Sequence, residues 1–155
     1  MKFSTREDIE APIEHVYAEV TDFATYERQA MRRGSDVRRR NPQTPVGVGT
    51  IWDIAFSFRG RDRKMTAEVT RLEPPQTLRV DMVSSGIDAV TMIELVALSP
   101  KRTRLAVSIE MSAKSLSARL LLQSLKLAKS NLTNRFKKRV GIFAQDVEGR
   151  YRGGV

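Results

Sequence analysis

The pattern of apolar and polar residues divides the chain into a mainly β part and a long C-terminal helix. Between residues 117 and 148, apolar residues recur at steps of three or four, which is the spacing of one helix face. The stripe consists of Leu121, Leu125, Ala128, Leu132, Phe136, Val140, Phe143 and Val147. One helix over this run would be roughly 45 Å long at 1.5 Å per residue. We expect an apolar sheet surface beneath it.

Alternating apolar and polar residues, typical of half-buried strands, predict that sheet. We expect strands near residues 2–10, 35–41, 50–58, 64–70, 78–82, 90–98 and 104–111. In 90–98 neither alternating set is clearly the more apolar, so the inward face of this strand stays open. Short strands at about ten-residue spacing, joined by tight turns, indicate an antiparallel meander rather than parallel βαβ units.

Two short helices are predicted between the first and second strands. Pro12 ends the first strand, because it lacks a backbone N–H, and suits the first turn of a helix. Apolar residues then follow helical spacing from 13 to 20. Asp22 is a natural N-cap for the second helix, which runs past Tyr26 and is closed by Gly34.

Length and composition predict one α+β domain covering residues 1–155, with 149–155 as a frayed tail. The chain contains no cysteine, which excludes thiol catalysis, disulfides and Cys-based zinc sites and fits a reducing compartment. The first residues lack the apolar core of a signal peptide, and no stretch approaches the length of a membrane span. We therefore expect a soluble, cytoplasmic protein. Its oligomeric state cannot be predicted.

The net charge of +9 would suit an anionic partner, but it equally describes a solvated basic exterior. Lys and Arg are scattered over many segments and are not interleaved with aromatic residues, so a nucleic-acid partner is not favoured. An alternative is transient contact with an anionic membrane surface, made by Arg38, Arg39 and Arg40 and by the outer face of the last helix.

Several kinds of chemistry lack the residues they need. His15 is the single histidine and is expected on or near the outer face of its helix, so neither a multi-histidine metal site nor a Ser-His-Asp triad is predicted. Residues 47–49, Gly-Val-Gly, match no phosphate-binding motif, and no cofactor is predicted. The loop around them is either a mobile lid or an ordinary connector.

The order of the predicted elements, together with four short sequence segments, resembles the helix-grip superfamily, which includes START lipid-transfer domains, polyketide cyclase/dehydrase-like proteins and pollen allergens. Residues 9–17, IEAPIEHVY, and residues 21–26, TDFATY, are similar to that superfamily's opening. Residues 48–50 and 103–105 are similar to the start of its third strand and to its last strand. The resemblance implies a curved seven-stranded antiparallel sheet around the long helix, enclosing an apolar cavity for lipids, sterols, polyketides or similar molecules.

The residues also predict a cavity, because a bent sheet and a straight helix cannot touch along their whole lengths. Its candidate lining is Trp52, Ile54, Phe56, Met65, Val80, Met82, Leu121 and Leu125. The alternative is that these side chains simply fill the core.

The leading hypothesis is binding of a small hydrophobic or amphipathic ligand, whose identity the sequence does not reveal. The alternative is a cyclase- or dehydrase-like enzyme that uses the same cavity. Its candidate proton carriers are Glu94, should its side chain point inward, and Tyr26 near the mouth of the cavity.

Overall fold

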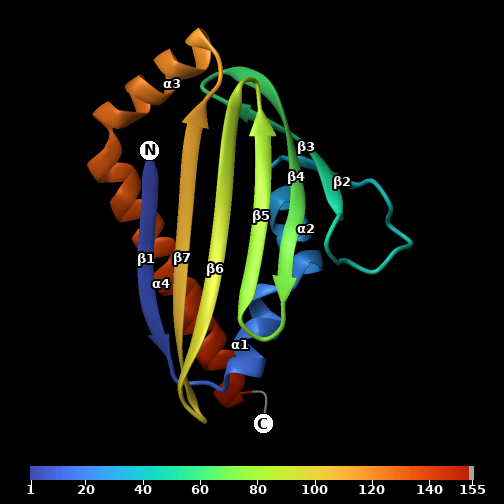
Figure 1. Cartoon of the computed structure of the whole chain (residues 1–155), viewed down its shortest axis with the longest axis vertical. Helices are drawn as coiled ribbons and strands as arrows, with labels where there is room; N and C mark the ends of the chain where they lie inside the picture. Colours follow the sequence, from blue (N-terminus) through green and yellow to red (C-terminus); the bar gives the residue numbers. More distant parts are fainter. Residues whose placement is uncertain (154–155) are drawn as a thin grey trace.

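The computed structural model describes residues 1–153 and contains a curved antiparallel sheet of seven strands in the order β1-β7-β6-β5-β4-β3-β2 (Figure 1). The strands are β1 (Lys2–Ile9), β2 (Asp36–Arg39), β3 (Ile51–Phe58), β4 (Arg61–Glu73), β5 (Thr77–Ser84), β6 (Ile87–Ser99) and β7 (Arg102–Ala113). From β2 to β7 each strand pairs with the next, and β1 closes the order beside β7. The predicted meander and the α+β class are confirmed.

Four helices lie on one side of this sheet or at its upper end in Figure 1: α1 (Ile13–Val20), α2 (Phe23–Arg32), α3 (Leu116–Leu127) and α4 (Lys129–Gly153). The two short helices and the long C-terminal helix are confirmed, but the expectation of one helix from 117 to 148 is wrong at Ala128. The backbone there leaves helical angles, with φ −104° and ψ 18°. The apolar stripe continues in step across Ala128, so its periodicity gave no sign of a change in direction.

The C-terminal end of α4 packs against α1 instead of fraying at residue 149. The Tyr151 ring lies 5.0 Å from the His15 ring, and Arg150 forms an ion pair with Glu19. His15 is half-buried rather than on the outer face, and its Nε2 donates to the Val147 carbonyl oxygen at 3.2 Å. The helix therefore continues through residues 149–153, and residues 154–155 lie outside the described part of the chain.

The structure shows which residues of β6 point toward the helices. Leu95 is buried, with 3% of its surface exposed, and it shares its face with Thr91 and Ile93. Met92 and Glu94 therefore lie on the outer face. The inward residues pack with apolar side chains of the helices to form the core.

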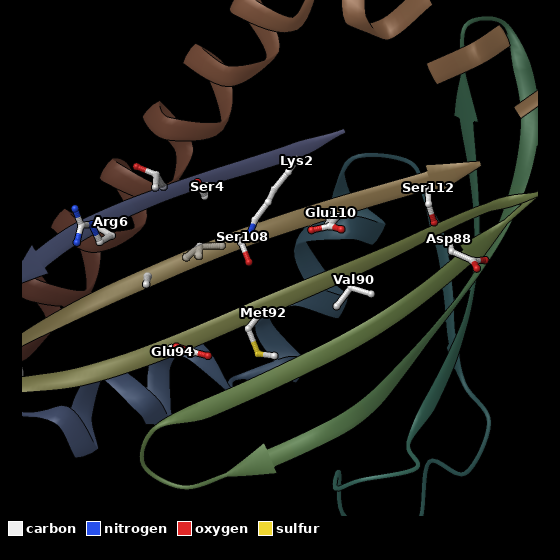
Figure 2. A pocket seen from close by; sticks show the side chains of 13 residues that line it. Lys2, Ser4, Arg6, Asp88, Val90, Met92, Glu94, Ser108, Glu110 and Ser112 are labelled. Carbon is white, nitrogen blue, oxygen red and sulfur yellow. The ribbon is translucent and has the colours of Figure 1, made fainter. Parts of the chain in front are cut away.

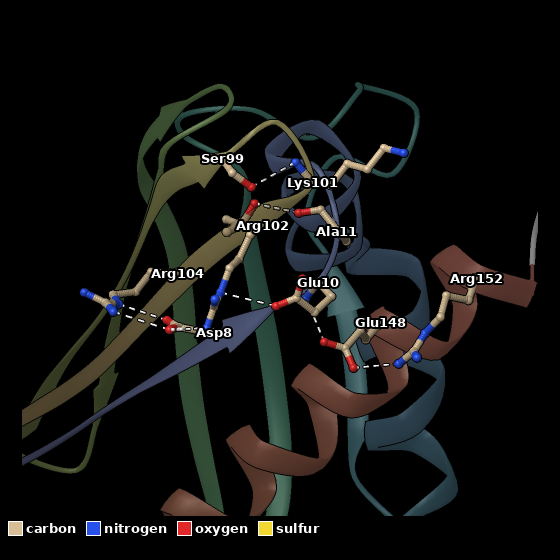
Figure 3. Close-up of polar contacts among 10 residues, drawn as sticks. Asp8, Glu10, Ala11, Ser99, Lys101, Arg102, Arg104, Glu148 and Arg152 are labelled. Atoms are coloured by element: carbon tan, nitrogen blue, oxygen red, sulfur yellow. Dashed lines mark hydrogen bonds and ion pairs between the residues drawn. The ribbon is translucent and has the colours of Figure 1, made fainter.

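One end of the molecule is held closed by polar contacts (Figure 3). The buried Thr103 hydroxyl donates to the Ala11 carbonyl oxygen at 2.8 Å. The Glu10 backbone N–H donates to the Glu148 carboxylate at 2.7 Å, which ties the end of β1 to α4. A two-pronged hydrogen bond from Arg104 lowers the pKa of Asp8. The C-terminal half of α4 is thereby fixed across the sheet, and the hollow space lies farther along the inner face.

Candidate ligand-binding cavity

Two neighbouring lobes lie between the inner face of the sheet and the helices. The larger lobe, of about 320 Å³, lies beneath α2, and the smaller, of about 230 Å³, lies beside α4. Both are lined by Val20, Tyr26 and Ile93, so the lobes meet at these side chains. The larger lobe is also lined by Phe23, Glu27, Ala30, Val37, Trp52, Ile54, Ala67, Leu78, Val80 and Thr91. The smaller is also lined by Leu105, Val107, Phe136, Arg139, Val140 and Phe143.

The short helix α2 creates the larger lobe. Asp22 caps its first turn, because its carboxylate accepts hydrogen bonds from the Thr25 backbone N–H at 3.3 Å and from the Thr25 hydroxyl at 2.7 Å. The Phe23 ring stacks at a tilt on Trp52, with 5.3 Å between the ring centres. None of the residues of α2 is fully buried, so this helix covers the sheet loosely and leaves space beneath it.

The structure brings part of the predicted lining to the cavity. Trp52, Ile54 and Val80 line the larger lobe. The other five candidates, Phe56, Met65, Met82, Leu121 and Leu125, line neither lobe. Phe56, Met65 and Met82 are half-buried on the stretch of sheet beyond α2, and the turn at Ala128 carries Leu121 and Leu125 away from it. A role of these residues in ligand binding stays a prediction.

Tyr26 lies at the junction of the lobes, but its hydroxyl is already engaged. It donates toward the backbone carbonyl oxygens of Val20, at 2.8 Å, and Glu19, at 3.1 Å. Burial, with the nearby charges of Asp22 and Glu19, raises the pKa of Tyr26 far above its ordinary value. A tyrosine in this state anchors α2 on α1 and is poorly suited to transfer protons at neutral pH.

Glu94 lies outside the cavity, on the outer face of the sheet, and its side chain is exposed. It borders an open groove of about 830 Å³. Figure 2 shows it there with Met92, Lys2, Arg6 and Glu110. Charges of both signs are spread along this face, as on an ordinary solvated sheet surface. The structure thus removes Glu94 as an acid or base for the cavity, because β6 turns its odd-numbered residues inward.

The sequence analysis missed a polar cluster at the wall of the larger lobe. One oxygen of Glu27 accepts hydrogen bonds from Arg39 at 2.6 Å and from the Trp52 indole at 3.2 Å. The Arg39 guanidinium lies 6.0 Å from the centre of the Trp52 ring, and its buried Nε has no hydrogen-bond partner. These residues come from α2, β2 and β3, so no local sequence pattern connects them.

Two other expectations concern the segment from 38 to 49. All three arginines of the basic run form ion pairs. Arg39 pairs with Glu27, and Arg40 Nε lies 2.9 Å from Asp53 Oδ2. Arg38 Nε lies 3.4 Å from Asp36 Oδ2. The basic run is thus largely neutralised by neighbouring carboxylates. The following loop projects outward beyond β2 and β3 (Figure 1), and none of its residues lines either lobe, which favours the connector over the lid.

Within residues 1–153, no helix combines the length and apolar character needed to cross a bilayer. The same part of the chain holds no cluster of three or more His, Asp or Glu side chains arranged to bind a metal ion.

A curved antiparallel sheet that wraps around a long C-terminal helix, with an apolar cavity between them, defines a helix-grip protein. The family model described as "polyketide cyclase / dehydrase and lipid transport" matches residues 1–149. The chain belongs to this family, and the resemblance inferred from residues 9–26 and from the order of the elements is confirmed.

Solved structures with the same fold are distant in sequence. The Zhui aromatase/cyclase from Streptomyces sp. R1128 is 12% identical, with a TM-score of 0.64 over 97% of this chain and 94% of that one. The protein TTHA0849 from Thermus thermophilus is 14% identical, with a TM-score of 0.59 over 95% and 97%. Ara h 8.0201 is 11% identical, with a TM-score of 0.58 over 99% and 98%. These likenesses show the fold alone, and a search of curated proteins found no match.

Proposed function

We propose that the protein binds a small hydrophobic or amphipathic molecule, of a lipid-, sterol- or polyketide-like kind, in the two-lobed cavity. The observation that carries this proposal is the hollow beneath α2, which is walled almost entirely by apolar side chains and contacts Trp52. Pockets for small ligands combine such walls with a few polar groups that set orientation. The lipid-transport activity in the family description supports the same reading.

The polar cluster favours an amphipathic ligand over a purely apolar one. Arg39 Nε is a buried donor without a partner, and such donors are rare because they lose their hydrogen bonds to water. It belongs to the ion pair with Glu27, whose side chain lines the larger lobe. A ligand oxygen placed near this pair would supply the missing acceptor, while the rest of the ligand lay along Ile54 and Val80.

A cyclase- or dehydrase-like reaction in the same cavity is the second candidate, and Glu27 is the observation that favours it. It is the one acidic side chain that lines either lobe within residues 1–153. Its engaged oxygen is held by two donors, however, which fixes the position of the carboxylate. Glu94 lies in solvent and the Tyr26 hydroxyl is engaged, so we place binding ahead of catalysis.

The single tryptophan provides the test, because Trp52 lines the cavity and its fluorescence reports on what lies beside it. Val80→Phe adds bulk inside the larger lobe. We expect it to weaken binding of a fatty acid or an apolar dye by about tenfold, since overfilling a packed site costs about 1–3 kcal/mol. Titration with Trp52 emission as the readout measures the affinity.

Val83→Phe is the matched control, because it makes the same change on the same strand at a residue that is 51% exposed on the outer face. It should bind as the unmodified protein does. Equal affinities of both variants, or no emission change with any apolar probe and no co-purified molecule in native mass spectrometry, would contradict the proposal.

A further inference from the structure

Helix α3 carries an apolar stripe that faces away from the molecule. Leu116, Leu120 and Leu127 are exposed to 73%, 59% and 91%. Steps of four and seven residues place them on one face of the helix. The opposite face holds Ala118 and Leu122, which are buried where α3 packs against β7. An exposed stripe of this kind is typical of a surface that binds an apolar partner.

Basic side chains border the leucine stripe on both sides. Arg119 and Lys126, seven residues apart and exposed, follow one side of it. Ser124 lies on the other side, and its hydroxyl oxygen accepts a hydrogen bond from Arg59 at 2.8 Å. This contact brings the turn between β3 and β4 to α3, and with it Arg61.

These cations are available to a partner. Within residues 1–153, none of Arg59, Arg61, Arg119 and Lys126 has a carboxylate oxygen within 4.0 Å. The acidic neighbour is Asp62 at the start of β4, which accepts a hydrogen bond from Ser57 on β3. The surface made by the leucine stripe and its basic borders is therefore mainly apolar along its middle, where Gln123 is the polar exception, and positive at its edges.

Charge complementarity decides between the possible partners. A second copy of the chain, related by a twofold axis through the stripe, would bring Arg119 and Lys126 against the same cations of its partner. An anionic bilayer is complementary to both parts of the surface. The leucines would contact acyl chains, and the cations at the edges of the stripe would contact phosphate oxygens in the headgroup layer. We propose that α3 docks the protein on an anionic lipid bilayer, with the helix axis parallel to the membrane plane. This docking surface is separate from the cavity and does not depend on a bound ligand.

Co-sedimentation of the full chain with vesicles tests the apolar part of the surface. The vesicles contain either phosphatidylcholine alone or equal parts of phosphatidylcholine and phosphatidylglycerol. We expect binding to the anionic vesicles, and the triple variant Leu116→Gln, Leu120→Gln, Leu127→Gln should reduce it by about tenfold or more, because three side chains lose their apolar contact with the bilayer. The matched control, Val96→Gln, Leu98→Gln, Ile142→Gln, changes three exposed apolar residues elsewhere and should bind within about twofold of the original protein.

A second pair of variants tests the charges. Arg119→Gln with Lys126→Gln should weaken binding to anionic vesicles, whereas Lys137→Gln with Lys138→Gln, which removes the same charge from the exposed side of α4, should not. Circular dichroism verifies the fold of each variant. Should the triple variant unfold, Leu127→Gln alone, at the most exposed leucine, replaces it.

Several results would overturn the proposal. One is binding to anionic vesicles that is no stronger than binding to phosphatidylcholine alone. Another is a test variant and its matched control that lose the same amount of vesicle binding. A third is a dimer in sedimentation equilibrium that the α3 leucine substitutions abolish, since the stripe would then face a second copy. A fourth is tight binding of an acidic protein at the same residues without any binding to vesicles.

Discussion

Asp22 is a single side chain on which one wall of the cavity depends. It caps α2, a helix without fully buried residues, so little core packing replaces the cap if it is lost. The hydroxyl of Thr25 donates to its carboxylate, and this bond is the main reason that the pKa of Asp22 is lowered. The ionised form is thus the one that the fold stabilises.

Asp22→Ala should lower the free energy of unfolding by about 1 kcal/mol, the usual effect of removing an N-cap. Urea denaturation measures this difference. Because the folded-state pKa lies below the unfolded value of about 3.9, the stabilisation is complete above that pH and is lost as the pH falls through the folded-state pKa. The difference between the two proteins should therefore persist at neutral pH and shrink below about pH 4.

Asp36→Ala is the control, because Asp36 is exposed and its ion pair with Arg38 at 3.4 Å is expected to contribute little. A loss of stability as large as that of Asp22→Ala would show that the cap has no special role.

The sequence predicted single residues well where the signal is local. Asp22 was expected as an N-cap from its place before an apolar-periodic segment, and Trp52 was expected inward from the alternation along its strand. Glu27 and Arg39 could not be found in this way, because their meeting depends on how α2 lies over β2. The Tyr26 hydroxyl was expected near the ligand, but it is engaged by carbonyl groups at the end of α1, which a residue pattern does not describe.

At the scale of elements, the start of α3 is held against the turn between β5 and β6. Gly86 adopts a left-handed conformation there, with φ +80°, and a Cβ added to it would lie 2.6 Å from Ser115 Oγ. That oxygen is the N-cap of α3, because it accepts from the Ala118 backbone N–H at 3.2 Å. The Gly86 carbonyl oxygen also accepts from Lys114 N–H at 2.7 Å. The direction of α3 therefore depends on this close approach.

Gly86→Ala should destabilise the protein more than Gly60→Ala. Both positions have positive φ, so each substitution costs about 1–2 kcal/mol from backbone strain. Only at Gly86 does the new methyl group meet the cap of α3, which adds about 1 kcal/mol or more. Thermal denaturation gives the total loss, and hydrogen exchange shows whether α3 amides open. Equal losses in the two variants would mean that the cap moves aside freely.

The sequence located every strand of the sheet, because each is bounded by turn residues and most alternate clearly between apolar and polar positions. It left the face of β6 open, since the residues from 90 to 96 include apolar side chains on both faces. It also joined α3 to α4, because spacing along one chain contains no information about where that chain changes direction. The expectation that Leu121 and Leu125 line the cavity depends on that error, because both belong to α3. The strand residues Phe56, Met65 and Met82 line neither lobe for another reason, because they lie on the stretch of sheet beyond α2.

At the scale of the whole molecule, part of the positive charge is engaged in surface ion pairs. The carboxyl groups of Asp8, Asp53, Glu73 and Asp81 each accept hydrogen bonds from an arginine, and each has its pKa lowered mainly by that contact. These pairs are well exposed, so each contributes modestly, and salt weakens them. Together they favour the fold at neutral pH.

Acid should destabilise the protein in a characteristic way. Each of these carboxyl groups stabilises the fold fully above its unfolded-state pKa of about 4, and loses that effect as the pH falls through its lower folded-state pKa. We expect the free energy of unfolding to stay nearly constant from pH 7 to about pH 5 and then to fall steadily below about pH 4. Urea denaturation between pH 7 and pH 3 measures this profile.

High salt should make the acid-induced loss smaller, because it screens the ion pairs in the folded state. Stability that decreases from pH 7 toward pH 5 would instead point to a group that titrates in that range when unfolded and whose pKa is lowered on folding, contrary to this expectation.

The shortness of β2 has a consequence for the behaviour of the protein in concentrated solution. This strand ends the sheet with four residues, and the chain then leaves through a segment that contains Pro42 and Pro45. The unpaired backbone groups of an edge strand can form hydrogen bonds with a strand of another chain, which is how fibrils grow. So brief an edge strand, which carries one acid and two arginines and is followed by prolines, offers few hydrogen-bonding groups to an incoming strand. The sheet is therefore protected from seeding amyloid-like aggregates on that side.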